Sequence, residues 1–287
     1  MAILDRDSSI RLERIIEETS TVYSLPLFYE RLNEVINHPK SSIADISRII
    51  TEDQGLTVKL LKLANSPMFG YYAKIESITK AVTIIGTQPL RDLALAVSVM
   101  DVFRNIPEEL MNMRSFWHHC ISCGTIARNL AIYLHERNVE RFFVAGMLHD
   151  IGQLILCTSI PDVVGAMIEE CRAQETIYYE EEKKCLGFDH TDIGASLLSK
   201  WKIPAAILDP VACHHKPAAA EQYPLETAVV HLSDIICQAM QWGRTGAQVV
   251  PPLDEAAWER INIPVSILGV ILKQSELQLE DAMAILA

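Results

Sequence analysis

The amino-acid sequence predicts an all-α protein built from two helical subdomains. Apolar residues recur three or four positions apart along most of the chain, which is the spacing of one helix face. The chain has only 12 Gly in 287 residues and few Asn-Gly or Asp-Gly pairs, so signals for β-hairpin turns are scarce. A hydrophobic content of 49% is enough for a sizeable core. No stretch of the sequence requires a sheet.

The first subdomain is expected over residues 1–104. Within it, one apolar stripe from Ile43 to Ile50 and another from Leu56 to Ala64 predict two short amphipathic helices. A further helix is expected from about Ser77 to Ile85, because Gly86 suits a left-handed C-terminal cap. The next helix then runs from about Thr87 to Phe103.

The second subdomain is expected over residues 105–242, after a boundary near Asn105 to Pro107. Its predicted helices cover roughly Ser115 to Glu136, Arg141 to Cys157, Pro161 to Gln174, Thr191 to Trp201, Pro204 to His215 and Glu226 to Trp242. Residues 243–287 form a predicted C-terminal extension, in which the part from Asp254 onward has the pattern of two more helices.

Charge and composition exclude several classes of protein. With 25 Lys and Arg against 37 Asp and Glu, the formal charge is −12, which disfavours binding to nucleic acid. The seven Cys are scattered, and the N-terminus lacks the apolar run of a signal peptide. The most apolar stretches are interrupted by polar residues and fall short of the roughly 20 residues that a membrane span needs. We therefore expect a cytoplasmic protein with reduced thiols that does not bind a membrane.

The histidines are the strongest candidates for chemistry. His149 and Asp150 are adjacent in a stretch with almost no polar face, and burial of both groups requires hydrogen bonds, an ion pair or a metal. His119 and His190 each share a helix face with apolar residues, so both should point inward. Alone, the His-Asp dipeptide is more typical of a hydrogen-bonded polar pair in a core.

Two further histidine motifs leave the alternatives open. His214 and His215 end a predicted helix, where they could bind a ligand or simply complement the helix dipole. His231 and Asp234 are three residues apart, and a surface pair at this spacing is the simpler interpretation.

Together these motifs carry a resemblance to a known family. Five segments resemble successive motifs of the HD phosphohydrolase superfamily: Trp117 to His119, Gly146 to Gly152, Asp189 to Leu198, His214-His215 and His231 to Asp234. Upstream segments are similar to the HDOD branch of that superfamily: Asp53 to Thr57, Leu60 to Ser66 and Ile78 to Val82. The resemblance covers roughly residues 20 to 240 and implies that the second subdomain is an HD-type helical bundle.

The resemblance also implies a metal site. The related HD-GYP cyclic di-GMP phosphodiesterases bind two metal ions, and this chain can fill each of seven ligand positions: His119, His149, Asp150, His190, His214, His215 and Asp234. Carried over, His119, His149, Asp150 and Asp234 would hold one ion. Asp150, as the bridge, would hold the other with His190, His214 and His215. Imidazole and carboxylate ligands suit divalent Fe, Mn, Zn or Ni better than Ca.

Three departures from the HD-GYP pattern count against hydrolysis. Gln153 occupies the position where those enzymes have a phosphate-binding lysine, so a positive charge for the substrate is missing. His214-His215 is followed by Lys216-Pro217 and not by a Gly-Tyr-Pro element. Ser115 replaces an acidic residue that binds a third metal in some relatives. We therefore expect a metal site without turnover; if the protein is active as a phosphohydrolase, Asp150 is the candidate catalytic residue.

HDOD proteins are bacterial signalling modules, so the resemblance implies protein partners such as response regulators or cyclic di-GMP pathway proteins, or a nucleotide ligand. The first subdomain, without a histidine cluster, is a candidate interaction platform, with Asn65 to Tyr72 as a candidate surface. The aromatic residues in that segment are equally explained as loop anchors.

Two other motifs are better explained by packing. Cys120 and Cys123 form a C-x-x-C motif inside a helix without a second pair, which favours core packing over a zinc site. The helices from Ser77 to Met100 resemble a helix-turn-helix, but the second one is mostly apolar.

Overall fold

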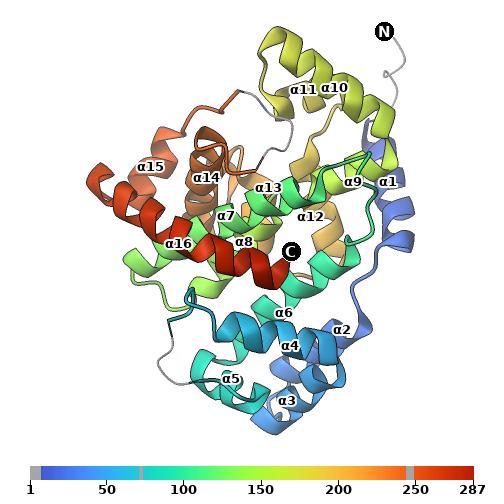
Figure 1. Cartoon of the computed structure of the whole chain (residues 1–287). Coiled ribbons are helices and arrows are strands. Elements are labelled where there is room, and N and C mark those ends of the chain that lie inside the picture. The colour runs from blue at the N-terminus through green and yellow to red at the C-terminus, as the bar shows by residue number, and fades with distance from the viewer. Residues whose placement is uncertain (1–7, 71–73, 244–248) are drawn as a thin grey trace.

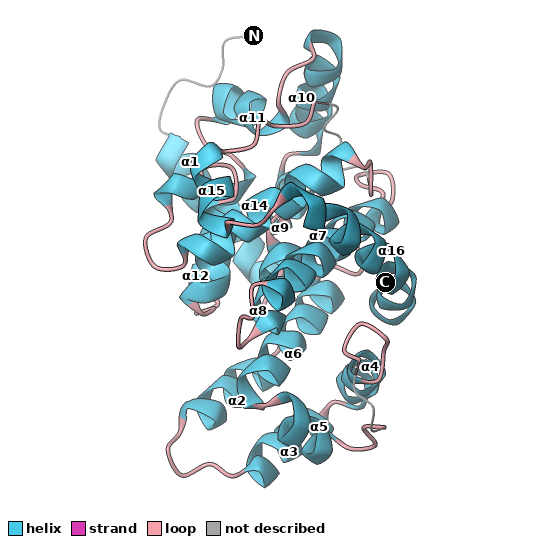
Figure 2. Cartoon of the chain, turned by 90° about the vertical axis from the view of Figure 1, so that its left-hand side faces the viewer, coloured by secondary structure: helices cyan, strands magenta, loops and turns pink. Residues whose placement is uncertain are grey.

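The protein folds as an assembly of α-helices. A computed structural model describes residues 8–70, 74–243 and 249–287, and no strand occurs in these ranges (Figure 2). The N-terminal part contains α1 (Ser8–Val22), α2 (Leu27–Asn37), α3 (Ile43–Glu52), α4 (Gln54–Ala64), α5 (Ile78–Ile85) and α6 (Thr87–Val102). The all-α prediction is therefore confirmed.

Local sequence signals determine the ends of these first helices. Ser42 and Asp45 form a reciprocal capping box at the start of α3, and Asp53 and Ser77 cap α4 and α5 through their side chains. Gly86 ends α5 with a positive φ of 101°, a conformation that side-chain-bearing residues rarely adopt. The sequence did not single out α1 and α2.

The second part of the chain forms the bundle that holds most of the histidines. Its helices are α7 (Met113–Tyr133), α8 (Val139–Leu148), α9 (Ile151–Ser159), α10 (Pro161–Gln174), α11 (Tyr178–Leu186), α12 (His190–Lys200), α13 (Ala205–Cys213), the 3₁₀ turn η1 (Pro217–Ala219) and α14 (Pro224–Ala239). The predicted single helix from Arg141 to Cys157 is wrong, because the chain breaks at His149 and Asp150 into α8 and α9. Helix α11 was not predicted.

The same apolar stretch is the one segment among the described residues that is long and apolar enough to cross a membrane. It covers Val139–Ser159, and 89% of its most apolar window is buried inside the protein. Since it is also broken between α8 and α9, it has the properties of a core element.

One hydrophobic core cluster continues from the N-terminal helices into the bundle. It includes Tyr29 and Leu63 from the first part, and Phe143 and Leu197 from the second. Helix α6 lies at the centre: every residue from Leu90 to Met100 is buried. A DNA-reading role for this helix is therefore excluded, and its packing role is confirmed.

The loop after α4 anchors the N-terminal part on the bundle. Met68 and Phe69 are buried, so they are anchors and do not offer the surface that was considered for a partner. Arg128 of α7 donates a hydrogen bond of 2.7 Å from Nη1 to the Met68 carbonyl oxygen, and its guanidinium lies 4.6 Å from the centre of the Phe69 ring. Tyr71 and Tyr72 lie outside the described residues.

The C-terminal extension contains α15 (Glu255–Ile261), the turn η2 (Val265–Ile267) and α16 (Leu268–Leu286). Helix α16, red in Figure 1, packs along α7. The buried side chain of Asn129 on α7 donates hydrogen bonds to Ser275 Oγ, at 2.8 Å, and to Gln278 Oε1, at 2.9 Å. The two helices in this tail match the sequence prediction.

Candidate metal centre

The predicted site residues come from five separate parts of the chain and lie in one cluster. His119 is on α7, His190 is the first residue of α12 and Asp234 is on α14. His149 and Asp150 lie at the α8–α9 junction, and His214 and His215 follow α13. All of these side chains are buried except that of His215, which is partly buried. The structure therefore brings together every residue of the predicted set.

The break between α8 and α9 lets two adjacent side chains reach the same cluster. In a straight helix, neighbouring side chains point about 100° apart. Here His149 is the C-cap of α8 and Asp150, with φ −98° and ψ 10°, is the N-cap of α9, so both residues lie in a turn between the two helices. The break that the sequence did not predict therefore helps to build the site.

Close helix contacts at glycines determine the spacing of the cluster. A Cβ on Gly146 of α8 would lie 2.8 Å from Cα of Gly124 on α7, the helix that carries His119. A Cβ on Gly152 of α9 would overlap the carbonyl oxygen of His190 on α12. Only glycine permits both close approaches.

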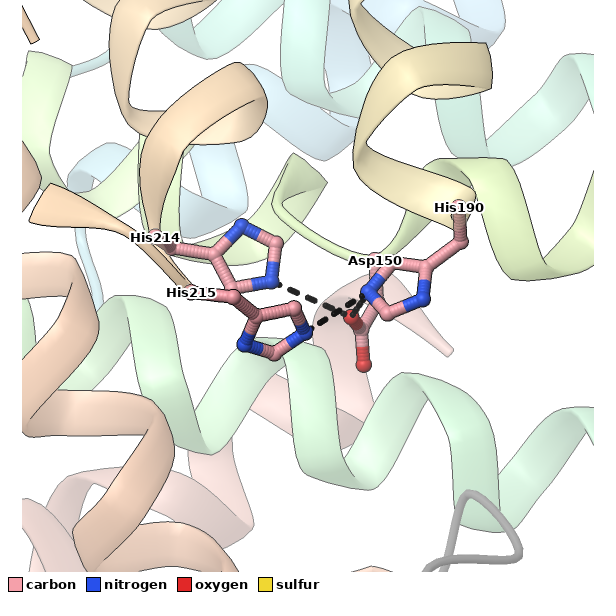
Figure 3. Close-up of side chains that lie close together, drawn as sticks. All are labelled: Asp150, His190, His214 and His215. Carbon is pink, nitrogen blue, oxygen red and sulfur yellow. Dashed lines mark hydrogen bonds and ion pairs between the residues drawn. The ribbon is translucent and has the colours of Figure 1, made fainter. Parts of the chain in front are cut away.

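The two carboxylate oxygens of Asp150 face different sets of histidines. Oδ2 lies 3.6 Å from His119 Nε2 and 3.3 Å from His149 Nε2. Oδ1 lies 3.1 Å from His190 Nε2 and 3.7 Å from His214 Nε2, and Figure 3 shows this second set together with His215. Asp150 is thus central to the cluster.

Asp234 completes the first set. Its Oδ1 lies 3.1 Å from His119 Nε2 and 3.6 Å from His149 Nε2. Gln238, one turn later on α14, donates from Nε2 to both carboxylate oxygens of Asp234 at 2.9 Å. These bonds hold the carboxylate toward the histidines.

Hydrogen bonds at Nδ1 orient three of the imidazole rings. His149 Nδ1 lies 2.7 Å from the Gly146 carbonyl oxygen, and His214 Nδ1 lies 3.1 Å from that of Val211. His190 Nδ1 lies 2.6 Å from Glu182 Oε2. A proton on Nδ1 leaves the lone pair on Nε2, the atom that points into the cluster.

Buried nitrogens without hydrogen bonds support a metal at this place. Nε2 of His119, His149 and His214 is buried and makes no hydrogen bond. Unpaired buried polar atoms are costly, and bound metal ions would satisfy all three nitrogens. Histidine nitrogens and carboxylate oxygens converge within 4.8 Å in three groups: Asp150 with His190, His214 and His215; His119 with His149 and Asp150; and His149 with His214 and Asp234. The donor set therefore fits a transition metal.

The electrostatics of the cluster also favour bound cations. Burial raises the pKa of the Asp150 and Asp234 carboxyls, but the neighbouring histidines hold both pKa values well below their usual range. Burial lowers the pKa of His214. Burial also acts to lower the pKa of His149. The Asp150 carboxylate outweighs this effect and raises the pKa of His149 well above its usual value. Two ionised carboxylates thus require positive charge, which protons or metal ions can supply.

A small pocket opens onto the cluster. Its lining consists of Asp150, Gln153, Ile177, Tyr178, Tyr179, His190, His215, Gln238, Val249 and Pro251. No lysine or arginine is among these residues. Gln153 is only 5% exposed, and its Oε1 is buried without a hydrogen bond. The position expected to bind phosphate therefore lies at the pocket but carries no charge.

Two residues that support the cluster were not among the predicted site residues, and a third, His231, has a different environment from the predicted one. Glu182 and Gln238 bind His190 and Asp234, as described above. His231 is buried, and its Nδ1 lies 2.6 Å from the His214 carbonyl oxygen, so the expected surface pair with Asp234 is wrong. Neither the charged run around Glu182 nor the three-residue spacing of His231 and Asp234 distinguishes buried side chains from exposed ones.

The cysteines of the C-x-x-C motif belong to none of the three groups of candidate ligands, although Cys123 also interacts with His149. Cys120 and Cys123 are free and fully buried, and Cys123 Sγ lies 3.9 Å from the Val230 carbonyl oxygen on α14. Their contacts are those of core residues, as the sequence indicated.

Comparison with known proteins agrees with this architecture. A family model described as the HDOD domain matches residues 22–217, which is more than half of the chain. The chain belongs to the HDOD domain family. An uncharacterized protein from Treponema pallidum (strain Nichols) is 24% identical to this HDOD protein over 268 residues, or 92% of the chain and 49% of the relative. The chain thus spans about half the length of this curated relative.

Solved structures share the fold. An HDOD domain protein of unknown function from Geobacter sulfurreducens is 22% identical, with a TM-score of 0.75 over 98% of this chain and 99% of its own. A candidate phosphohydrolase from Shewanella amazonensis SB2B is 25% identical, with a TM-score of 0.72 over 96% and 98%. The HDOD fold therefore extends over nearly the whole chain.

Proposed function

We propose that this HDOD protein is a signal-transduction module that carries an HD-type dinuclear metal centre and acts by binding, without hydrolytic turnover. The division of the Asp150 carboxylate between two histidine sets is the observation that carries the proposal. A bridging carboxylate with two sets of imidazoles is an arrangement that can hold two neighbouring metal ions.

The ligand sets follow from the contacts of Asp150. His119, His149 and Asp234 would hold one ion with Oδ2 of Asp150. The second set would use Oδ1 of Asp150, and its other ligands are His190, His214 and His215. Imidazole and carboxylate together favour divalent Fe or Mn, with Zn and Ni as alternatives.

The described lining of the pocket contains no lysine or arginine, which argues against hydrolysis. Two bound metal ions would supply Lewis-acid activation of water and phosphate. A phosphoryl substrate also needs fixed positive charge from the protein, whereas Gln153 is uncharged and the described pocket lining contains no lysine or arginine. The family resemblance supports partners such as response regulators or cyclic di-GMP pathway proteins, or a nucleotide ligand, in the cytoplasm.

An active metal-dependent phosphohydrolase is the second candidate. The observation in its favour is that the pocket reaches Asp150, His190 and His215. Under this alternative Asp150 would be catalytic through the two ions, and cyclic dinucleotides would be the first substrates to test.

One experiment distinguishes the two functions. Purified protein is analysed for metal by mass spectrometry, loaded with Mn²⁺ or Fe²⁺ and incubated with cyclic di-GMP and a model phosphodiester. We expect about two ions per chain and no sustained product formation. Steady hydrolysis that disappears in Asp150→Ala would establish the second candidate, and a chain that takes up no transition metal would refute both.

A further inference from the structure

Glu182 lies behind the candidate metal centre, on a helix that the sequence did not predict. Its side chain is completely buried. Oε2 accepts hydrogen bonds from His190 Nδ1, at 2.6 Å, and from the His190 backbone N–H, at 3.0 Å. These two bonds fix both the ring and the first turn of α12. The carboxylate is therefore placed to control one candidate ligand.

The burial of this carboxylate is costly for the fold alone. Its other oxygen, Oε1, is buried without a hydrogen bond. Among the described residues its one ion pair is with His190, because the neighbouring Lys183 pairs instead with Asp189, at 2.8 Å. A neutral acceptor could make the same hydrogen bonds to His190 without the cost of a buried charge. The negative charge of Glu182 must therefore be compensated by positive charge on His190 or by a cation that His190 binds.

A second contact connects the same helix to the site. Tyr179, three residues before Glu182, stacks on the His215 ring with centroids 4.1 Å apart and planes 19° apart. Tyr178, four residues before Glu182, lines the pocket. Helix α11 packs on α10, and Figure 1 shows the two helices together at one end of the molecule. One face of α11 thus contacts two candidate ligands of the same set.

We propose that Glu182 is a positioning residue of the metal centre, which holds His190 with Nε2 toward the metal and thereby couples metal occupancy to the docking of α11. This rests on the proposed metal centre. The carboxylate keeps the Nδ1 proton on the ring, increases the electron density at Nε2 and offsets the charge of a bound cation. Binding of the metal in turn stabilises α11 against the bundle, because the coupling is reciprocal.

Matched substitutions on one helix test the positioning role. Mn²⁺ affinity is measured from the free-ion EPR signal for wild type, Glu182→Gln, Glu182→Ala and the control Glu181→Gln. Glu181 is also buried, but it pairs with Lys184 at 2.9 Å and has no contact with a histidine of the cluster. We expect Glu182→Ala to bind the weaker-held ion about 10- to 100-fold less tightly, Glu182→Gln to lose less, and the control to match wild type.

The stability of the metal-free protein separates positioning from a purely structural role. The Gln side chain removes a buried charge and keeps the acceptor, so metal-free Glu182→Gln should melt at or above the wild-type temperature although it binds metal less tightly. Equal Mn²⁺ affinity in Glu182→Gln, Glu182→Ala and wild type would overturn the proposal while leaving the metal centre intact. Equal losses in the Glu181 control would also overturn it.

Hydrogen exchange tests the coupling to α11. Addition of Mn²⁺ should slow amide exchange in residues 178–186 of wild type and of Glu181→Gln, and should slow it much less in Glu182→Ala. Metal uptake by wild type without any change in this segment would disprove the coupling. No metal uptake by wild type would instead refute the proposed metal centre on which the coupling rests, so the two failures are distinguishable.

Discussion

Substitution of Gly152 by alanine tests whether close helix packing builds the metal centre. The new Cβ would overlap the His190 carbonyl oxygen and lie 2.8 Å from its carbonyl carbon and 3.0 Å from the Gly194 nitrogen. All three obstacles are backbone atoms, so α9 and α12 must move apart. Overpacking of this kind costs about 1–3 kcal/mol, and the better helix propensity of alanine returns about 0.5–1 kcal/mol. We expect a net loss of up to about 2.5 kcal/mol.

The same movement should disturb metal binding. His190 Nε2 lies 3.1 Å from Asp150 Oδ1 across this helix contact, and metal–ligand distances are expected within about 0.2 Å of their standard values. Thermal unfolding should therefore shift down by several degrees, and metal analysis should show loss of the ion on the His190 side. Gly165→Ala on α10 is the control, because a Cβ there meets nothing within 4 Å. Wild-type melting and full metal content in Gly152→Ala would refute the reasoning.

Three further predictions concern two other residues of the site and one cysteine outside it. Asp150→Ala should lose both metal ions, because its two oxygens face both histidine sets; retention of one ion in metal analysis would contradict the bridging role. Gln153→Lys should increase binding of inorganic phosphate to the Mn²⁺-loaded protein, measured by calorimetry, whereas unchanged binding would show that the pocket excludes phosphate for another reason. Burial and the adjacent Glu181 carboxylate raise the pKa of Cys185 to about 11, so its alkylation rate should rise about tenfold per pH unit from 8 to 10; a rate independent of pH would contradict the raised pKa.

Helical spacing among apolar neighbours predicted the direction of only part of the cluster, and the full set of seven residues came from the family resemblance. His119 and His190 share a face with residues that must be buried, so their direction follows from the period of the helix. The order of the motifs, compared with that in the related family, then assigned Asp150 to both histidine sets. The convergence of these groups required only that the helices pack as those of the related family do.

Other parts of the site depend on tertiary contacts that periodicity does not encode. The stretch around His149 is apolar on every side, so no change of face marks the break between α8 and α9. Glu182 lies in the segment Tyr178–Leu186, which contains consecutive charged residues. Such a pattern is typical of a solvent-exposed segment. It is buried only because α11 lies against His190, a contact between residues of separate helices.

The C-terminal helix determines which fragments of this protein can be used for such measurements. Ile271 of α16 belongs to one hydrophobic core cluster and Leu279 to the other, so this helix joins the two. A fragment ending at residue 242 would expose the face of α7 that α16 covers, and it would leave the Asn129 amide without its partners Ser275 and Gln278. A metal-binding defect in such a fragment would report the loss of support for α7 and would say nothing about the ligands themselves.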